Sequence, residues 1–291
     1  MKQRTAIVAL VAGLAAVAVS TACAGDDERT TVGRLPPSHH VHALRAADDG
    51  TLLLGVHGAL WRSTDAGLTW EEVGLEGEDA MAIGIDPGTD GPLLVAGHGL
   101  LARAPRPTAP FDSLRPDELG SLDVHALAQA PSEPTTAYAF VVDAGLFITD
   151  DAGDSWTRVA PLGDEFGSDI TGMAVDPADP DTLLMAGGRT GVVHSTDRGR
   201  TFNRVVGAGG FAVAYVGDRS DQAVAVTQRG IETSQDGGRT WQVVTQPGVL
   251  PGRPAALAGD GHGAVWVVTE EPRSLQRSHD GGRTWEEIAR A

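Results

Sequence analysis

Five of the nine histidines in this 291-residue chain lie in short motifs whose side chains are suited to hold a metal ion. The motifs are His40-Val41-His42, Val56-His57-Gly58, Gly97-His98-Gly99 and Asp123-Val124-His125. Imidazole nitrogens, carboxylates and thioethers are ligands of Zn²⁺, copper and other late transition metals. The motifs are far apart in sequence, so they can act together only if the fold brings them to one place.

An eight-residue pattern that occurs five times is the strongest structural signal in the sequence. Each copy begins with Ser or Thr, has Asp two positions later and Gly two positions after that, and ends on Thr or Ser followed by an aromatic residue. In a hairpin turn of this composition the Asp side chain accepts backbone N–H hydrogen bonds, and Gly adopts a backbone angle closed to other residues. We therefore expect a structural role for the five aspartates, Asp65, Asp151, Asp197, Asp236 and Asp280.

This pattern resembles the Asp-box, or BNR repeat, of sialidases, sortilin-like receptors and photosystem assembly propellers. The resemblance implies an all-β fold, a β-propeller of four-stranded antiparallel blades with Asp-box hairpins. In enzymes with this repeat the active site lies on the face of the propeller opposite the boxes.

The intervals between the repeats predict the number of blades. Successive box aspartates are 86, 46, 39 and 44 residues apart, so one repeat between Asp65 and Asp151 has lost its box, near Ala104 to Asp112. Four short apolar stretches in each unit of about 40 residues are typical of a propeller blade. Residues 41–291 hold six such units, which we expect to begin near Val41, Ala80, Val124, Ile170, Phe211 and Pro254. A seven-bladed propeller and a pair of β-sandwiches are the alternatives, but a sandwich does not explain the fixed period.

The order of strands in a blade predicts which loops share a face. Each box joins the third and fourth strands, so the opposite face collects the turns between second and third strands and the links between blades. His57 and His98 fall in such turns. Aligned first strands place His42, Met81, His125 and Thr171 at one equivalent position, with His40, Asp79, Asp123 and Asp169 two residues earlier.

Two interpretations of this polar channel mouth remain open. In the first, the mouth binds a transition metal, Zn or Cu, or another ligand through His40, His42, His57, Met81, His98 and His125. In the second, it is a solvated polar rim with no ligand. We expect structural roles for His194, His262 and His279.

The N-terminus predicts export from the cell. Lys2 and Arg4 precede an apolar run that ends at Val19, as in a signal peptide, and the run is shorter than the roughly 20 residues of a membrane-spanning helix. Ser20-Thr21-Ala22-Cys23 resembles a bacterial lipobox, although Ser20 stands where Leu is usual. We expect a signal peptide at 1–22, a lipid on Cys23, a flexible tether over 23–38 and the propeller over 39–291, outside the cell and held to the bacterial cell membrane. An unmodified thiol behind an ordinary cleavage site is the alternative.

Composition limits the classes of partner. The formal net charge of −17 argues against nucleic acid and against anionic lipid headgroups. A single cysteine excludes an intrachain disulfide, so the domain must be stable through packing alone. We expect a monomer.

The start of the first predicted blade, through Gly50-Thr51-Leu52-Leu53-Leu54-Gly55-Val56-His57-Gly58, resembles secreted bacterial propellers labelled exo-α-sialidase or glycosyl hydrolase-like. A sialidase requires a tyrosine nucleophile, but Tyr138 falls in a core position and Tyr215 in a first strand. Asp79, Asp123 and Asp169 remain candidates for the carboxylate pair of another glycosidase. We predict a binding module for a metal, small ligand or protein, with a glycan-active hydrolase as the alternative.

Overall fold

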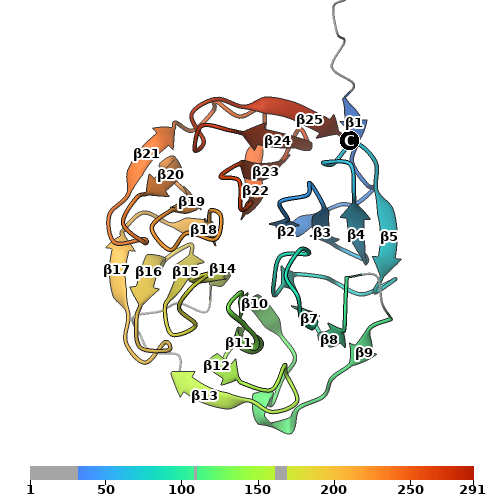
Figure 1. The fold of residues 1–291 in the computed structure, drawn as a ribbon, viewed down its shortest axis with the longest axis vertical. Coiled ribbons are helices and arrows are strands. Elements are labelled where there is room, and N and C mark those ends of the chain that lie inside the picture. Colours follow the sequence, from blue (N-terminus) through green and yellow to red (C-terminus); the bar gives the residue numbers. More distant parts are fainter. Residues whose placement is uncertain (1–31, 108–109, 161–168) are drawn as a thin grey trace, which may run out of the picture. The chain divides into compact units, whose positions relative to one another are not determined.

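In a computed structural model, residues 32–107, 110–160 and 169–291 are described, and they form a ring of six antiparallel sheets (Figure 1). Blade 1 consists of β2 (Val41–Ala46), β3 (Leu52–Val56), β4 (Ala59–Ser63) and β5 (Glu71–Gly74). Blade 2 consists of β6 (Ala82–Ile83), β7 (Leu93–Gly97), β8 (Leu100–Ala104) and β9 (Asp112–Ser113). Blade 3 consists of β10 (Val124–Ala130), β11 (Glu133–Val141), β12 (Gly145–Thr149) and β13 (Thr157–Ala160).

The second half of the ring repeats this order. Blade 4 consists of β14 (Ile170–Val175), β15 (Leu183–Gly187), β16 (Gly191–Ser195) and β17 (Asn203–Val206). Blade 5 consists of β18 (Gly210–Tyr215), β19 (Ala223–Thr227), β20 (Gly230–Ser234) and β21 (Gln242–Thr245). Blade 6 consists of β22 (Arg253–Gly259), β23 (Val265–Glu270), β24 (Ser274–Ser278) and β25 (Glu286–Arg290).

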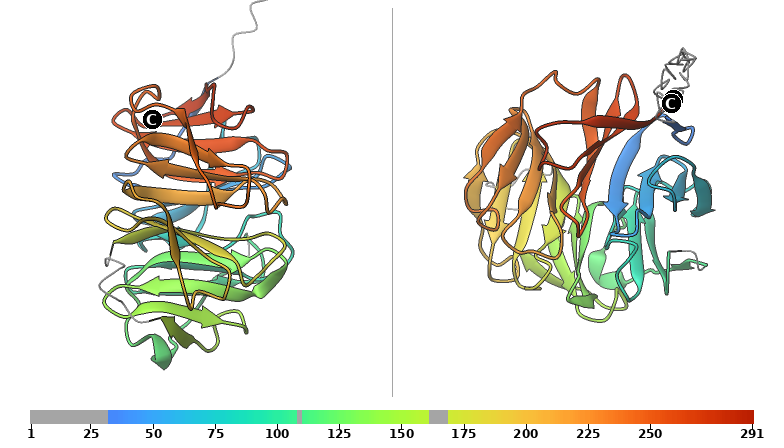
Figure 2. Two further views of the ribbon diagram at one scale, coloured as in Figure 1. Left: turned by 90° about the vertical axis from the view of Figure 1, so that its left-hand side faces the viewer. Right: turned by 45° about the horizontal axis from the view of Figure 1, so that its top comes forward.

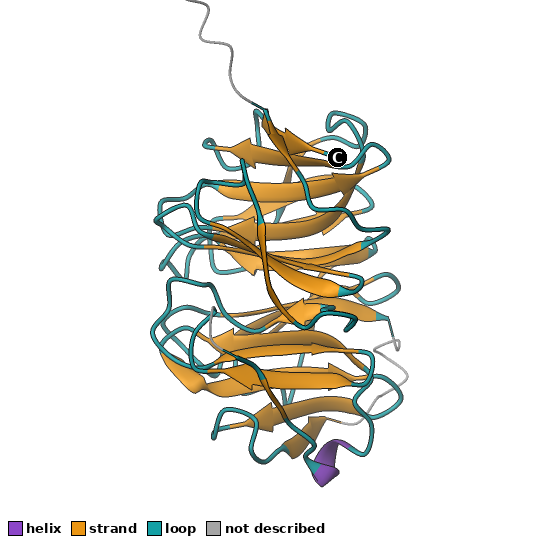
Figure 3. Ribbon diagram, turned by 90° about the vertical axis from the view of Figure 1, so that its right-hand side faces the viewer, coloured by secondary structure: helices purple, strands orange, loops and turns teal. Residues whose placement is uncertain are grey.

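The prediction of six four-stranded blades is confirmed, and the alternatives of seven blades or two sandwiches are wrong. Each blade begins within two residues of its predicted start. The segment that has lost its box joins β8 to β9, the connection that carries the box in the other blades. Figure 3 shows one short helix, the 3₁₀ turn η1 (Asp117–Leu119). None of the helices in the described ranges is long and apolar enough to cross a membrane.

The position of a strand within its blade determines its composition. First strands surround the central channel and fourth strands lie at the periphery (Figure 1). The middle strands are sandwiched between neighbouring blades, as the stacked sheets in Figure 2 show. Every residue of β3 and β7 is buried, and both strands are almost wholly apolar. A strand buried on both faces is expected to be continuously apolar, which explains why the second and third strands lack an alternating pattern.

The hydrophobic core is divided among the six seams between blades. Each seam holds one cluster of buried side chains drawn from two adjacent blades. The seam that closes the ring joins blade 6 to blade 1 and contains Leu44, Leu54, Trp266 and Val268. The ring is therefore closed by the same apolar packing that joins its other blades.

The N-terminal segment differs from the expectation of a tether that extends to Ser38. Gly33–Arg34 form strand β1, which pairs in parallel with β25 at the outer edge of blade 6. Leu35 is 3% exposed and belongs to the cluster that closes the ring. Residues 33–35 are thus part of the propeller, because they supply a fifth strand and an apolar side chain at its closing seam. The predicted signal peptide and Cys23 lie outside the described residues.

The Asp-box turns have the hydrogen bonds expected from their sequence. In the last box, Asp280 Oδ1 accepts hydrogen bonds from the backbone N–H groups of Arg283 and Thr284, and its Oδ2 accepts one from the Thr284 hydroxyl. The Ser278 hydroxyl donates to Asp280 and accepts from the N–H of Gly282. In each of the other four boxes, the Asp side chain likewise accepts a hydrogen bond from the backbone N–H of the residue four positions later. These contacts support the structural role assigned to the box aspartates.

The box glycines also place the turns against the preceding blade. At the five box glycines, which have positive φ angles of 77° to 90°, a Cβ atom would contact an aliphatic side chain of the blade before. For Gly67 this side chain is Leu275 of blade 6, and for Gly238 it is Leu184 of blade 4. Glycine is therefore required both by the turn and by the close approach of two blades.

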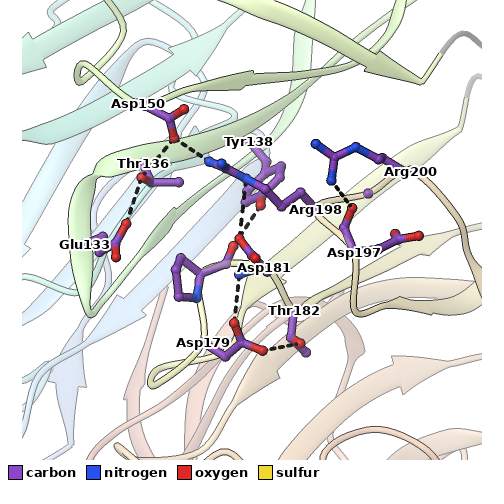
Figure 4. Close-up of polar contacts among 12 residues, drawn as sticks. Glu133, Thr136, Tyr138, Asp150, Asp179, Asp181, Thr182, Asp197, Arg198 and Arg200 are labelled. Atoms are coloured by element: carbon purple, nitrogen blue, oxygen red, sulfur yellow. Dashed lines mark hydrogen bonds and ion pairs between the residues drawn. The ribbon is translucent and has the colours of Figure 1, made fainter.

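Polar contacts also join blades 3 and 4 across the seam between them (Figure 4). The guanidinium of Arg198, in the box of blade 4, pairs with Asp150 of blade 3 and lies 3.4 Å from Asp181. The buried Tyr138 of β11 donates its hydroxyl hydrogen to the Pro180 carbonyl at 2.7 Å. This tyrosine joins two blades and has the core position expected from the sequence.

Candidate metal centre at the channel mouth

One end of the central channel opens into a recess of about 250 Å³ on the face opposite the Asp-boxes. Each of the six blades contributes one residue at the equivalent position of its first strand, namely His42, Met81, His125, Thr171, Phe211 and Ala255. In five first strands the pairing register shifts at this residue, as in a β-bulge. Bulges redirect side chains at the ends of strands, so this repeated irregularity helps to form the wall of the recess.

Three of the predicted site residues meet at the junction of blades 1 and 2. Asp79 lies between two imidazoles, with its Oδ1 2.9 Å from Nε2 of His42 and its Oδ2 3.4 Å from Nδ1 of His57. His42 and Asp79 are mostly buried, with side chains 20% and 14% exposed, whereas His57 is 62% exposed. We call His42, His57 and Asp79 the first triad.

A second triad occupies the junction of blades 2 and 3. Oδ1 of Asp123 lies 2.7 Å from Nδ1 of His98 and 3.2 Å from Nε2 of His125. The two imidazole rings are 5.1 Å apart between centroids, in an edge-on arrangement. His57 and His98 occupy equivalent turns in successive blades. Asp79 and Asp123 occupy equivalent positions in successive links between blades.

Both triads have the donor set and the spacing of a metal site. In each, the three ligand atoms lie within 4.8 Å of one another. Two atoms bound to one Zn²⁺ at about 2.1 Å are at most about 4.2 Å apart, so small side-chain rotations would complete either site. Two imidazoles and one carboxylate are a common ligand set for zinc and other late transition metals.

Three buried atoms in the triads have no aligned hydrogen-bond partner: Nε2 of His42, Oδ1 of Asp79 and Nε2 of His125. The first two are 2.9 Å apart, which is close enough for a hydrogen bond, but their geometry is not that of one. Buried polar atoms without partners are costly. A cation held between the two atoms would satisfy both.

The charge state of His42 suits a ligand. Burial lowers the pKa of its imidazole, and the nearby Asp79 carboxylate only partly opposes this effect. The ring is therefore neutral at pH 7, and a neutral imidazole nitrogen is the form that binds a metal.

The other predicted site residues are not part of the triads. His40 is 68% exposed, with its Nδ1 3.8 Å from Oε1 of Glu270. Met81 lines the recess from blade 2, which both triads share. Asp169 accepts a hydrogen bond from the backbone N–H of Arg189 and lies near the Thr190 hydroxyl, so it is bound to a turn of its own blade. His194, His262 and His279 do not line the recess.

The sequence analysis missed two charged residues of blade 6 that line the recess, Arg253 and Glu270. Glu270 accepts hydrogen bonds from the Val41 backbone N–H at 3.1 Å and from Arg253 at 2.7 Å. A carboxylate at the end of the apolar segment 265–269 was the available signal, because it occupies the same end of a second strand as His57 and His98.

The tyrosine nucleophile that a sialidase mechanism requires is not found at the recess. Neither Tyr138 nor Tyr215 lines it. Burial raises the pKa of the Tyr138 hydroxyl to about 12, and burial also raises that of Tyr215. Arg34 belongs to β1 at the outer edge of blade 6 and does not line the recess.

The opposite mouth of the channel is a wide acidic depression of about 490 Å³, formed by turns between first and second strands. Two of its five aspartates are bonded to their own turns, whereas Asp48 accepts a hydrogen bond from the Gly261 N–H of blade 6. Asp49 accepts from the N–H of Thr51 and Asp260 from that of Ala264, both at 2.8 Å. These carboxylates therefore stabilise turns, as the box aspartates do.

Comparison with known proteins agrees with the fold. Residues 276–287, which contain the last box, match the model of the BNR/Asp-box repeat. No curated protein sequence matches the chain significantly.

Several solved structures share the architecture. The GH74 xyloglucanase from Xanthomonas campestris superposes with a TM-score of 0.61 and 18% identity, over 89% of this chain and 46% of that enzyme. YCF48 bound to D1 peptide gives 0.56 and 15%, over 87% and 83%. A chain of the Nidogen/Laminin complex gives 0.65 and 13%, over 82% and 93%. The chain spans less than half the length of the GH74 enzymes that it matches.

The fold and its repeats define a β-propeller with BNR/Asp-box repeats. At these identities the similarity establishes the fold alone, since one fold can carry unrelated functions. The solved structures include glycoside hydrolases as well as proteins found in complexes with a peptide or another protein.

Proposed function

We propose that the protein is a binding module that holds late transition metal ions, Zn²⁺ or copper, in two sites at the channel mouth. The observation that carries the proposal is the pair of triads, in each of which two imidazoles and one carboxylate converge within 4.8 Å. Each triad supplies three ligands, so a tetrahedral ion keeps its fourth position for water or another molecule. A purely solvated rim would give no reason for imidazole and carboxylate atoms that are buried and have no hydrogen-bond partner.

In this proposal the module acts outside the bacterial cell, held to the membrane by a lipid on Cys23. The support is the sequence of residues 1–23, with its basic start, apolar run and cysteine. Mass spectrometry of the protein from membranes tests this part, because a diacylglyceryl group on Cys23 changes the mass of the N-terminal peptide.

Metal titration of the purified full chain tests the sites. After removal of metal, isothermal titration calorimetry with Zn²⁺ should give two ions bound per chain. His42→Ala and His125→Ala should each reduce the number to one, and the double variant to zero. The control is His279→Ala, which removes a 65% exposed imidazole from a box on the other face and should leave two ions. Failure of the unaltered chain to bind Zn²⁺ or Cu²⁺ would leave the solvated rim as the correct interpretation.

The alternative is a glycan-active hydrolase, and the observation in its favour is that Asp79 and Asp123 both lie at the channel mouth. Glycosidases use two carboxylates about 5 to 10 Å apart. Each of these carboxylates, however, lies between two imidazoles and is a ligand in the metal-binding proposal. Turnover of a panel of aryl glycosides that is abolished by Asp123→Asn would replace the binding proposal with this one.

A further inference from the structure

A groove of about 480 Å³ adjoins the metal recess between blades 5 and 6. Its wall is largely apolar and includes Val226, Ile231, Leu250 and Pro251. Three residues, Phe211, Arg253 and Pro254, line both the groove and the recess, so the two cavities adjoin. The groove lies within the size range of small-molecule sites.

Phe211 is unusual in its exposure. Its side chain is 40% exposed, and only two other large hydrophobic residues in the described ranges, Leu68 and Val249, are similarly exposed. Val249 belongs to the loop 246–252, which forms one side of the groove. Two of the three exposed hydrophobic side chains are therefore at or beside this cavity, whereas Leu68 lies in a box on the opposite face.

The charge at the junction of the cavities depends on metal. Without metal, the carboxylates of Asp79, Asp123, Glu270 and Glu271 outnumber the Arg253 guanidinium, which leaves an excess of three negative charges among the triads, the recess and the groove. Two divalent cations in the triads would change this to an excess of one positive charge. An anionic group is therefore repelled from the empty recess and attracted to the loaded one.

We propose that the recess and the groove together bind a small amphipathic carboxylate, whose head group takes the open coordination position of a triad metal and whose hydrocarbon tail lies in the groove along Phe211. The proposal rests on the metal-binding function. Arg253 lies at the junction and supplies a guanidinium beside the path from metal to groove. Because metal and carboxylate assist each other, each should raise the affinity for the other by the same factor.

Calorimetry of the full chain with decanoate tests the proposal. Decanoate should bind the Zn²⁺-loaded chain at least tenfold more tightly than the metal-free chain, and tenfold more tightly than acetate, which has the same head group and no long tail. Saturating decanoate should raise the affinity for Zn²⁺ by the same factor as Zn²⁺ raises that for decanoate. Phe211→Ala should weaken decanoate binding at least fivefold and leave Zn²⁺ affinity, measured without decanoate, unchanged. Leu68→Ala, the matched exposed hydrophobic on the other face, should change neither.

The possible failures are distinguishable. If two Zn²⁺ ions bind and decanoate binds equally well with and without them, the coordinated head group is wrong and the metal-binding function stands. If acetate and decanoate bind alike, or Phe211→Ala binds decanoate normally, the tail is not in the groove. If Zn²⁺ itself does not bind, the titration with metal alone reveals that the proposed function is wrong, and this inference falls with it.

Discussion

His57 and Asp79 face each other across an isolated antiparallel bridge that joins the turn of blade 1 to the start of blade 2. His98 and Asp123 form the same bridge one blade further along. Backbone pairing thus positions two of the three ligands in each triad. The third ligand differs between the triads. His42 lies in blade 1, which precedes the first bridge along the chain, whereas His125 lies in blade 3, which follows the second bridge. Met81 occupies the equivalent position in blade 2, so the blades that supply the two third ligands lie on either side of it.

Metal binding should raise thermal stability, because the triads join neighbouring blades. At a free Zn²⁺ concentration of one hundred times Kd, one site adds about 2.7 kcal/mol to the free energy of unfolding. For a domain of this size that corresponds to a rise in Tm of about 5 to 10 °C per site. Differential scanning calorimetry with Zn²⁺ and then with excess chelator measures the effect. The variant His42→Ala with His125→Ala should show no rise, and His279→Ala the full rise.

Leu35→Ala should destabilise the protein by about 2 to 4 kcal/mol, because it removes a buried aliphatic side chain from the seam that closes the ring. Urea unfolding measures the change. Arg34→Ala, an exposed neighbour in the same strand, should change the free energy of unfolding by less than about 0.5 kcal/mol. Equal stability of the Leu35 variant and the unaltered protein would mean that residues 33–35 do not pack on the propeller in solution.

The turn chemistry of the boxes made the fold predictable from the sequence. Asp and Gly at fixed offsets specify one kind of hairpin, and their interval specifies the blade, so even the blade that lacks a box was located. The alignment of first strands and the placement of turns predicted that His42, His57 and Asp79 share one face, but not that these three side chains meet. The bulge at His42 and His125 was not predictable, since it is a shift in the pairing of the first and second strands of one blade that no residue type in the sequence marks.

Other differences between expectation and structure have similar causes. Gly33–Arg34 was predicted to be part of the tether because a strand of two residues carries no periodic pattern. Its partner, Ala289–Arg290, is at the far end of the chain. Arg253 and Glu270 were missed because their proximity to His40 depends on ring closure. In each case the deciding contact joins blade 6 to a segment near the start of the chain, and the one local signal, the carboxylate that ends segment 265–269, does not by itself identify its partner.

Gly67→Ala should cost about 2 to 4 kcal/mol of stability. The residue has φ of +90°, and its new Cβ would overlap Leu275 of blade 6 and approach Leu52 to 3.3 Å. Gly263→Ala is the matched control, because its φ is +87° and no atom lies within 4 Å of the added Cβ. The control should cost about 1 kcal/mol, the part due to the backbone angle alone. Chemical denaturation of both variants separates backbone strain from packing, and equal losses would contradict a close contact between box and preceding blade.

Acid should destabilise the protein through its box aspartates. Hydrogen bonds from the Thr240 hydroxyl and backbone lower the pKa of Asp236 to about 2, and hydrogen bonds led by the Thr284 backbone lower that of Asp280. In the unfolded chain these carboxyls have an ordinary pKa of about 3.8, so the unfolded state binds protons first as the pH falls. The stabilisation is complete above about pH 5 and is mostly lost by about pH 2. Asp236→Asn should therefore have a lower urea midpoint than the unaltered protein at pH 7, and this difference should shrink to near zero at pH 2. Asp90→Asn, a substitution at an exposed aspartate outside the boxes, should have a midpoint close to that of the unaltered protein throughout. A difference for Asp236→Asn that stays constant from pH 7 to pH 2 would mean that its carboxylate charge does not stabilise the turn.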